Sequence, residues 1–164
     1  MRSIRRLTID DIPRVLEIQA AAYAPHLLEA GEVFAAKIRS HPGWCLGSAS
    51  DDGVLAAYVI TFPMSSTESV GLHETATRSV VADGECPILY IHDMAVHPSF
   101  QANGHGGRML HALEDLARRS GQTVIEMVAI ESAVSFWERN GFNATDDEVY
   151  TGYGHGARKM RRTV

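Results

Sequence analysis

The sequence predicts an α+β protein in which helices flank a single mixed sheet. Three observations lead to this prediction. Segments typical of strands occur at the start, middle and end of the chain, segments with helical spacing lie between them, and the order of elements is β-α-α-β-β-β-α-β-α-β-β. Because the chain has 164 residues, 45% of them hydrophobic, and no internal repeat or linker, we expect one domain over residues 1–164.

The first half of the chain supplies a strand, two helices and a hairpin. The segment SIRRLTI alternates, as strands do. A T-x-x-D capping box then opens a helix predicted over residues 11–23, and a second helix is predicted from about 29 to 39. The turn signal DDG joins the predicted strands WCLGSAS and VLAAYVITF. The polar segment 63–85 is either a long loop or one weak element.

The second half contains the strongest strand signal, PILYIHDMAV. Apolar residues on one face predict a helix over residues 108–119, and QTVIEMVAI predicts a central strand. The segment SAVSFWERN predicts a short helix with Gly141 as its C-cap. A strand from Phe142 onward and a last strand in ARKMRRTV, separated by the glycine-rich turn TGYGHG, complete the sheet.

Composition and charge argue against several classes of protein. The net charge is −5 and the isoelectric point about 5.9, so we expect no nucleic-acid partner. The two cysteines form neither a CxxC motif nor a disulfide framework, which favours a reducing, cytoplasmic location. No apolar run approaches the roughly 20 residues that cross a bilayer, and no signal peptide is evident, so no membrane association is expected. The sequence predicts no metal site.

The segment SFQANGHGG, between the strongest strand and the next helix, carries three glycines within four positions. A dinucleotide fingerprint would need a glycine at position 109, where the chain has Met109, and a P-loop would need a lysine that is absent here. These spacings argue against a nucleotide-binding regulatory domain. Bare backbone amides at a helix N-terminus instead predict a phosphate site, because that helix end has unpaired donors and a partial positive charge.

Two motifs point to a known family. The letters QANGHG, residues 101–106, resemble the Q/R-x-x-G-x-G/A pyrophosphate loop of the GCN5-related N-acetyltransferase (GNAT) superfamily. The preceding DMAVHPSF resembles the central strand of that family, and AVSFWERNGF resembles its second signature, A-x-x-F-Y-E-x-x-G-F. The resemblance covers residues 89–142 and implies the GNAT-like acyl-CoA acyltransferase fold, whose mixed sheet is mainly antiparallel.

The resemblance implies that acetyl-CoA (coenzyme A) is the acetyl donor. It places the pyrophosphate on backbone amides of residues 101–108, and the pantetheine arm along residues 94–96, pairing like an added strand. That strand is expected to carry a bulge and to separate from the strand at 123–129, so that the thioester enters the gap. A backbone N–H near Met94 or Ala95 is then expected to stabilise the oxyanion.

The second signature departs from the family pattern. Ile130 stands where an asparagine is often found, so Ser132 or Ser135 is the candidate for that cofactor contact, with a helix N-cap as the alternative role of Ser132. The side chain of His105 is expected to face solvent. The residues expected to contact the cofactor are Met94, Ala95, Val96, Gln101, Ala102, Asn103, Gly104, His105, Gly106, Gly107, Arg108, Ser132, Phe136 and Trp137.

His92 is the candidate base that accepts a proton from the amine. Tyr90 lies two positions earlier on the same strand face, and Asp93 is expected on the opposite face. The arylalkylamine N-acetyltransferases, which this segment resembles, carry histidines on the face of Tyr90 and His92. The alternative is a hydrogen-bonded histidine with a purely structural role.

The candidate acid is harder to assign. In the family a tyrosine commonly protonates the leaving thiolate, and here that position is Trp137, whose indole donates a hydrogen bond but is no useful acid. Tyr150 and Tyr153 are the nearest substitutes, with ordinary half-buried strand aromatics as the alternative interpretation. The predicted catalytic set is therefore His92, Tyr90 and Tyr153, and Trp137 is expected to pack beside the sulfur.

The acceptor pocket is expected to come from the first half of the chain. Its candidate lining residues are Tyr23, His26, Glu29, Glu32 and Phe34, because carboxylates beside aromatic surfaces suit a cationic amine, although Glu29 and Glu32 are also readable as solvated helix residues. The predicted function is acetyl transfer to a small-molecule or protein amine, with a homodimer left open. The alternative is a non-catalytic acyl-CoA-binding sensor, which Trp137 favours.

Overall fold

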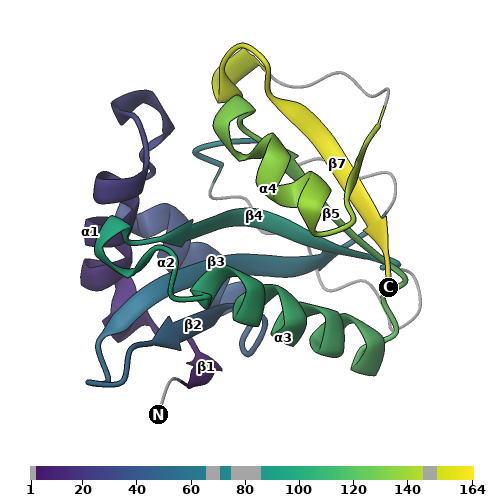
Figure 1. Ribbon diagram of the computed structural model, residues 1–164. Coiled ribbons are helices and arrows are strands. Elements are labelled where there is room, and N and C mark those ends of the chain that lie inside the picture. Colours follow the sequence, from purple (N-terminus) through teal and green to yellow (C-terminus); the bar gives the residue numbers. More distant parts are fainter. Residues whose placement is uncertain (1–2, 66–70, 75–85, 146–150) are drawn as a thin grey trace.

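Figure 1 shows the computed structural model, which describes residues 3–65, 71–74, 86–145 and 151–164. The strands are β1 Ile4–Arg6, β2 Leu46–Ala49, β3 Leu55–Met64, β4 Ile88–Val96, β5 Val124–Ala129, β6 Asn143–Ala144 and β7 Arg158–Thr163. The helices are α1 Ile12–Ala22, α2 Gly31–Ser40, α3 His105–Arg119 and α4 Val134–Arg139. Short 3₁₀ turns are η1 Ile9–Asp11, η2 Pro25–Leu27, η3 Pro98–Phe100, η4 Glu131–Ala133 and η5 Thr151–Tyr153.

The strands of the described residues form one sheet in the order β1-β2-β3-β4-β5-β7-β6. Every neighbouring pair is antiparallel except β4 and β5, which are parallel. The parallel pair is joined through α3, as a crossover requires. The predicted order of elements and the mixed, mainly antiparallel sheet are confirmed.

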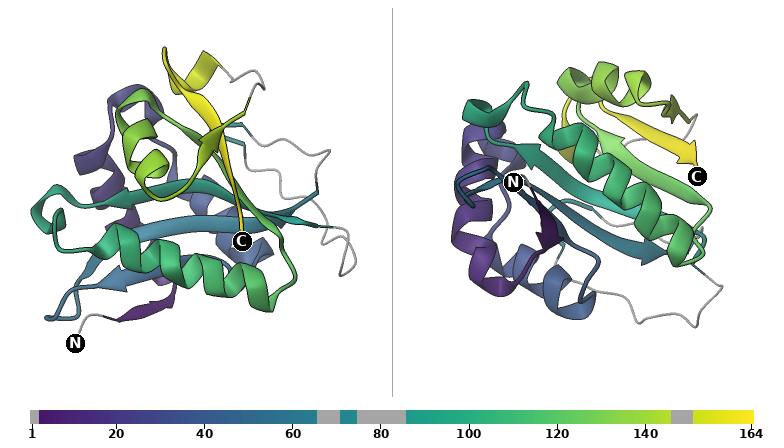
Figure 2. Two further views of the ribbon diagram at one scale, coloured as in Figure 1. Left: turned by 45° about the vertical axis from the view of Figure 1, so that its right-hand side comes forward. Right: turned by 60° about the horizontal axis from the view of Figure 1, so that its bottom comes forward.

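Helices cover both faces of the sheet (Figures 1 and 2). On one face, α1 and α2 bury Val15, Ile18 and Phe34 against Tyr58 and Ile60 of β3. On the other face, Met109 and Leu113 of α3 and Trp137 of α4 pack on alternate residues of the central strands. These strand residues include Val59, Leu89, Ile91 and Ile125. Both clusters exclude water from apolar side chains, so each helix is held where its amphipathic pattern predicts.

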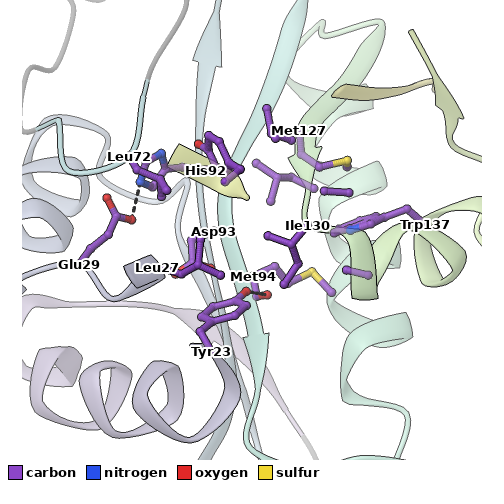
Figure 3. Close-up of a pocket in the computed structure, with 15 residues that line it drawn as sticks. Tyr23, Leu27, Glu29, Leu72, His92, Asp93, Met94, Met127, Ile130 and Trp137 are labelled. Carbon is purple, nitrogen blue, oxygen red and sulfur yellow. Dashed lines mark hydrogen bonds and ion pairs between the residues drawn. The ribbon is translucent and has the colours of Figure 1, made fainter. Parts of the chain in front are cut away.

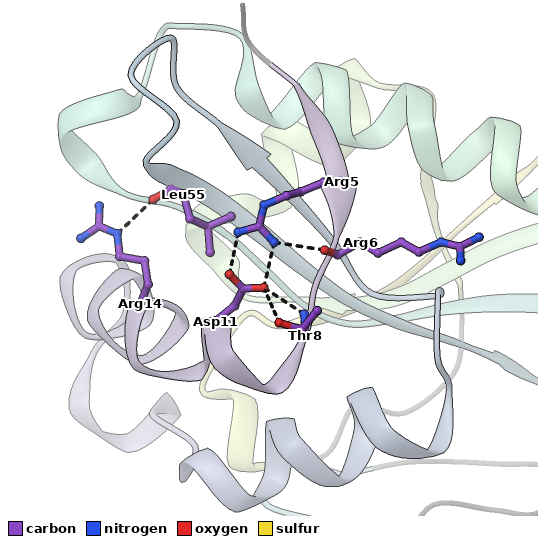
Figure 4. Close-up of polar contacts among 6 residues, drawn as sticks. All are labelled: Arg5, Arg6, Thr8, Asp11, Arg14 and Leu55. Atoms are coloured by element: carbon purple, nitrogen blue, oxygen red, sulfur yellow. Dashed lines mark hydrogen bonds and ion pairs between the residues drawn. The ribbon is translucent and has the colours of Figure 1, made fainter.

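Polar contacts fix the start of α1 (Figure 4). The backbone N–H of Thr8 donates to Asp11 Oδ2 at 2.9 Å, and Arg5 donates to both carboxylate oxygens of Asp11 at 2.8 and 2.6 Å. The hydrogen bond from Arg5 holds the pKa of Asp11 below its usual value, although partial burial opposes this. Arg14 Nε donates to the carbonyl of Leu55 at 3.0 Å and so ties α1 to β3. The predicted capping box is thus confirmed.

A bulge in β4 determines which residues share a face. Ile60 of β3 lies opposite Asp93, but the next residue, Thr61, lies opposite Ile91, so His92 is an extra residue in β4. Because two residues of a bulge oppose one on the partner strand, the alternation shifts by one position there. Asp93 therefore lies on the α1/α2 face with Tyr90, and the prediction that it lies on the opposite face is wrong.

Beyond the bulge, β4 and β5 separate. Their parallel pairing ends where Ile91 meets Met127, whereas β5 continues to pair with β7 as far as Ala129. Within the described part of the chain, the last part of β4 therefore has β3 on one side and no strand on the other. The resemblance to the GNAT family implied both the bulge and the separation, and both are present.

Two helix boundaries differ from the sequence prediction. The helix predicted from residue 108 begins at His105, because Gly104 adopts a left-handed φ of 75° as its N-cap and turns the chain into the helix one turn earlier. The helix predicted from residue 29 begins at Gly31, and Glu29 precedes it. The sequence left the segment 63–85 unassigned. Its first two residues belong to β3, and the structure also describes residues 65 and 71–74 of this segment. No described helix is long and apolar enough to cross a bilayer.

Candidate active site

A pocket lies where β4 and β5 separate (Figure 3). Both strands contribute to its walls, and α4, η5, Leu72 and the segments that follow α1 and β5 contribute the rest. The lining residues are Tyr23, Leu27, Glu29, Leu72, Ile91, His92, Asp93, Met94, Met127, Val128, Ala129, Ile130, Ala133, Trp137 and Tyr153. The structure thus brings four predicted site residues, His92, Met94, Trp137 and Tyr153, to one pocket.

His92 is buried and paired with a carboxylate. Its Nε2 lies 2.7 Å from Oε1 of Glu29, and Oε2 of Glu29 accepts a hydrogen bond from the backbone N–H of His73 at 2.7 Å. Burial raises the pKa of Glu29, but the hydrogen bond and charge of His92, the His73 amide and the charge of Lys37 together bring it below its usual value. Glu29 lines the pocket as expected, but as the partner of His92.

Asp93 is a second carboxylate in the pocket; its residue is half-buried, and no sequence pattern had identified it as a site residue. Its Oδ2 accepts a hydrogen bond from the hydroxyl of Tyr58 at 2.5 Å. Burial raises the pKa of Asp93 to about 6, although Tyr58, His92 and Tyr23 each favour the ionised form. A carboxylate that titrates near neutral pH inside a pocket is a candidate functional group.

The raised pKa of Asp93 predicts how Asp93→Asn changes stability with pH. Because the folded-state pKa of about 6 exceeds the ordinary value of 3.8, the wild-type protein loses stability as the pH rises between these two values. The variant has no such loss. Its stability relative to wild type should therefore improve between about pH 4 and about pH 6 and level off above about pH 7, with a total change of up to ~3 kcal/mol. Thermal unfolding of both proteins across this range is the measurement, and a difference that does not vary with pH would refute the raised pKa.

Tyr153 and Tyr90 differ in their relation to the pocket. Tyr153 lines it from η5, whereas Tyr90 lies behind the lining, with its ring centroid 5.6 Å from that of Phe62. Burial, and next the neighbouring Tyr90, raise the pKa of Tyr153 far above its ordinary value. The Tyr153 hydroxyl therefore keeps its proton and is available as a donor. The other acid candidate, Tyr150, lies outside the described residues.

Trp137 is part of an aromatic cluster at one end of the pocket. Its ring packs edge-on against Phe136 and Phe142, with centroids 5.1 Å apart in each pair, and its side chain is buried. An aromatic side chain held by two others contributes packing and shape to the pocket wall. This environment supports a packing role for Trp137 rather than proton transfer.

We therefore expect Trp137→Phe to keep most of any turnover, within about threefold, while lowering the melting temperature because a smaller ring leaves a cavity. Removal of a general acid would instead lower kcat about a hundredfold or more. Steady-state kinetics together with thermal unfolding separate the two outcomes. A hundredfold loss in a variant that remains folded would assign a proton-transfer role to the indole.

The loop before α3 presents unpaired donors. Gly104 and Ala102 both have left-handed φ values, 75° and 65°, and no side chain caps the helix. The first N–H groups of α3 therefore have no intrahelical partner. Arg108 Nη1 donates to the carbonyl of Asn103 at 3.0 Å, while Nε and Nη2 of Arg108 are buried without a hydrogen-bond partner among the described residues. Such a group of donors suits an anion.

The N-terminus of α3 packs beside the pocket. A Cβ placed on Gly106 would lie 3.4 Å from the ring of Phe136 and 3.6 Å from the methyl group of Met94, a pocket residue. Gly107 is more open, since a Cβ there would meet no atom within 4 Å. The glycine at 106 thus allows α3 to approach β4 and α4 closely.

Two expectations for side chains are wrong. His105 is buried rather than solvent-facing, with Nδ1 2.8 Å from the hydroxyl oxygen of Ser48, because it is the first residue of α3 and its side chain turns toward the sheet. Ser132 is exposed within η4, where Ile130 is the N-cap, so Ser132 caps no helix.

Two of the five residues predicted to line the acceptor pocket lie at this pocket. Tyr23 and Glu29 line the pocket. Phe34 is fully buried in the core under α1 and α2, and neither His26 nor Glu32 is among the lining residues. Leu27 and Leu72 complete this wall, and no sequence pattern had singled them out.

Comparison with known proteins decides the family. A sequence model of the acetyltransferase (GNAT) family matches residues 12–142. The chain belongs to the acetyltransferase (GNAT) family. The resemblance carried by the glycine loop and the second signature is thereby confirmed. A search of curated proteins finds no match to this chain.

Solved structures share the GNAT fold over nearly the whole chain. The ribosomal-protein-S18-alanine N-acetyltransferase from Escherichia coli is 20% identical, with a TM-score of 0.69 over 99% of this chain and 94% of its own. YncA from Salmonella typhimurium, solved with its cofactor acetyl-CoA, is 22% identical, with a TM-score of 0.69 over 99% and 94%. The GNAT-like decarboxylase GphF, solved with isobutyryl-CoA, is 14% identical, with a TM-score of 0.76 over 98% and 98%. At these identities the likeness shows the fold, which hosts more than one reaction.

Proposed function

We propose that this GNAT protein transfers an acetyl group from acetyl-CoA to an amine by direct attack of the amine on the thioester. One observation carries the proposal: the separation of β4 and β5 opens a pocket that holds His92 and lies beside the N-terminus of α3, where Gly106 packs next to Met94 of the pocket. The pocket suits the reacting groups, and the N-terminus of α3 suits a pyrophosphate.

The chain's own donors fit coenzyme A. The first-turn amides of α3 and the unpartnered nitrogens of Arg108 would hold the pyrophosphate. Along a strand, the backbone N–H and C=O groups of successive residues point to opposite sides. The N–H of His97, directly after β4, donates to the carbonyl of Ala56 in β3. The backbone groups of Val96 and Met94 therefore point away from β3 and into the gap. These two residues would pair with the pantetheine arm. The bound donor supplies an activated thioester, and the residues around it do the remaining work.

The proton transfers fall to pocket side chains. An alkylamine with a pKa near 10.4 is mostly protonated at neutral pH, so a base is needed, and His92 takes that role. The N–H of Met94 is the oxyanion donor, because it faces the gap, whereas Ala95 faces β3. Tyr153 keeps its proton and lines the pocket, so its hydroxyl would donate a hydrogen bond to the departing thiolate. The thiolate can leave as the anion, because a thiol has an ordinary pKa near 8.5.

Trp137 supports a second candidate function, a non-catalytic acyl-CoA-binding sensor. This residue fills the position where the family commonly has a tyrosine acid, and its packing supplies no acid. In that case acetyl-CoA would bind in the same pocket without transfer. The catalytic proposal, in contrast, needs an acceptor substrate, which is a small-molecule amine or a protein amine.

A screen of small amines and peptides for coenzyme A release, read with a thiol reagent, distinguishes the two candidates. We expect release that depends on one class of amine and exceeds the rate without protein. Calorimetry with acetyl-CoA runs beside it. Binding without amine-dependent release across the screen would favour the sensor, and absence of binding would contradict both.

A further inference from the structure

We propose that Glu29 is a positioning residue that holds His92 through Nε2, so that Nδ1 is the nitrogen that accepts the proton of the amine. This inference rests on the proposed function, because it concerns the base of that reaction. It assigns to Glu29 a role different from binding a cationic acceptor, which its position in the pocket first suggests.

The pair is enclosed and rigid (Figure 3). The Nε2 of His92 and Oε1 of Glu29 are 2.7 Å apart, and the two side chains are 0% and 2% exposed. The backbone of Glu29 is fixed on both sides by Gln19, whose side chain donates to the Glu29 carbonyl at 2.6 Å and accepts from the Glu29 N–H at 3.0 Å. With His73 N–H on Oε2, both carboxylate oxygens are engaged. Glu29 therefore has no oxygen left without a partner for an amine.

Charge determines which nitrogen carries the hydrogen. The pKa of Glu29 lies below its usual value, since burial, which raises it, is outweighed by His92, His73 and Lys37. An ionised carboxylate only accepts hydrogen bonds, so Nε2 of His92 must donate. A neutral imidazole has one N–H, which leaves a lone pair on Nδ1. The Nδ1 atom is buried and has no hydrogen-bond partner among the described residues.

An ionised carboxylate on one nitrogen favours both the correct tautomer and the imidazolium that forms when the other nitrogen takes a proton. Further charged or titratable groups face this region: Asp93 from the same strand, Lys37 from α2, Tyr23 from the C-cap of α1 and Tyr153 from η5. Any pH profile must therefore be compared between variants that differ only at Glu29 or His92.

The first test reads the tautomer. Nitrogen-15 NMR of the histidine side chains, with the His92 signals assigned by their loss in His92→Gln, should show the proton on Nε2 in the wild-type protein. In Glu29→Gln, the amide can either accept or donate, so the two tautomers should become mixed. A wild-type proton on Nδ1 would overturn the proposal, whether or not the protein turns over any amine.

The second test uses kinetics on an amine that the wild type acetylates. Glu29→Gln should lower kcat about tenfold or more and leave the KM for acetyl-CoA unchanged. In the His92→Gln background the same change should cause no further loss, because Glu29 acts only through His92. Glu17→Gln, an exposed partner of Arg14 on α1, is the matched control and should behave as wild type.

The outcomes separate this inference from the proposed function. Unchanged kcat in Glu29→Gln, or losses that multiply in the double variant, would show that Glu29 does not act through His92 while acetyl transfer stands. If the wild type releases no coenzyme A with any amine, the proposed reaction fails, and the NMR result alone decides whether Glu29 sets the tautomer.

Discussion

Replacing His92 by glutamine is expected to lower kcat for acetyl transfer about a hundredfold or more, while the affinity for acetyl-CoA stays near that of wild type. His92 lies in the bulge of β4, is buried at the pocket and has one nitrogen held by Glu29. Glutamine has a similar reach but cannot accept the proton of an ammonium ion, and loss of a general base commonly has an effect of this size. Steady-state kinetics and calorimetry measure the two quantities.

The loss should depend on the acceptor. An amine of low pKa is already neutral and needs no base, so it should be the least affected. The matched control is His111→Gln, which makes the same change at an exposed position on α3, where the side chain is 74% exposed. If His92→Gln were as fast as the wild type for amines of high pKa, His92 would be structural and the proton would leave by another route.

The second large effect is expected for Gly106→Val, which should weaken acetyl-CoA binding about tenfold or more. A Cβ at this position would already touch the Phe136 ring at 3.4 Å and the Met94 methyl at 3.6 Å, so the branches of valine would overlap with them. The overlap must push the start of α3 away from β4 and α4, and a misplaced helix end holds a phosphate less well. Calorimetry with acetyl-CoA measures the change.

Two controls accompany this variant. Gly106→Ala adds only the Cβ, at ordinary contact distances, and should lose much less affinity. His111→Val places the same branched residue in α3 on an exposed face, and so measures the general effect of valine on the helix. If Gly106→Val is folded and binds acetyl-CoA as tightly as wild type, the N-terminus of α3 is not the pyrophosphate site.

Much of the fold was predictable because its signals are local. Capping at Asp11, the DDG turn and the apolar periods each depend on neighbouring residues. The start of α3 was misplaced because a left-handed Gly104 does not change the apolar spacing on which the prediction rested. The wrong expectation that His105 faces solvent has the same cause. His105 was placed in the loop, whereas it is the first residue of α3 and its side chain turns toward Ser48.

The site was less predictable because its contacts join distant segments. The family resemblance implied a bulge in β4 but not the residue at which it occurs. The bulge at His92 shifts the alternation by one position, and Asp93 therefore lies on the α1/α2 face. The partner of His92 comes from 63 positions earlier, through a connection between η2 and α2 that has no periodic pattern. In contrast, His92, Met94 and Trp137 were predicted because family motifs or strand alternation fix their places, and Tyr153 was predicted only as a nearby tyrosine in the last hairpin.

Acetyl transfer itself is measured most directly with acetyl-CoA that carries an isotopic label in its acetyl group, incubated with the protein and a mixture of small amines and peptides. Mass spectrometry then locates the label. We expect it on the nitrogen of one class of amine, in an amount equal to the coenzyme A released, and not on the protein. Label that remains on the thioester with every amine, although acetyl-CoA binds, would contradict a catalytic role for the pocket between β4 and β5.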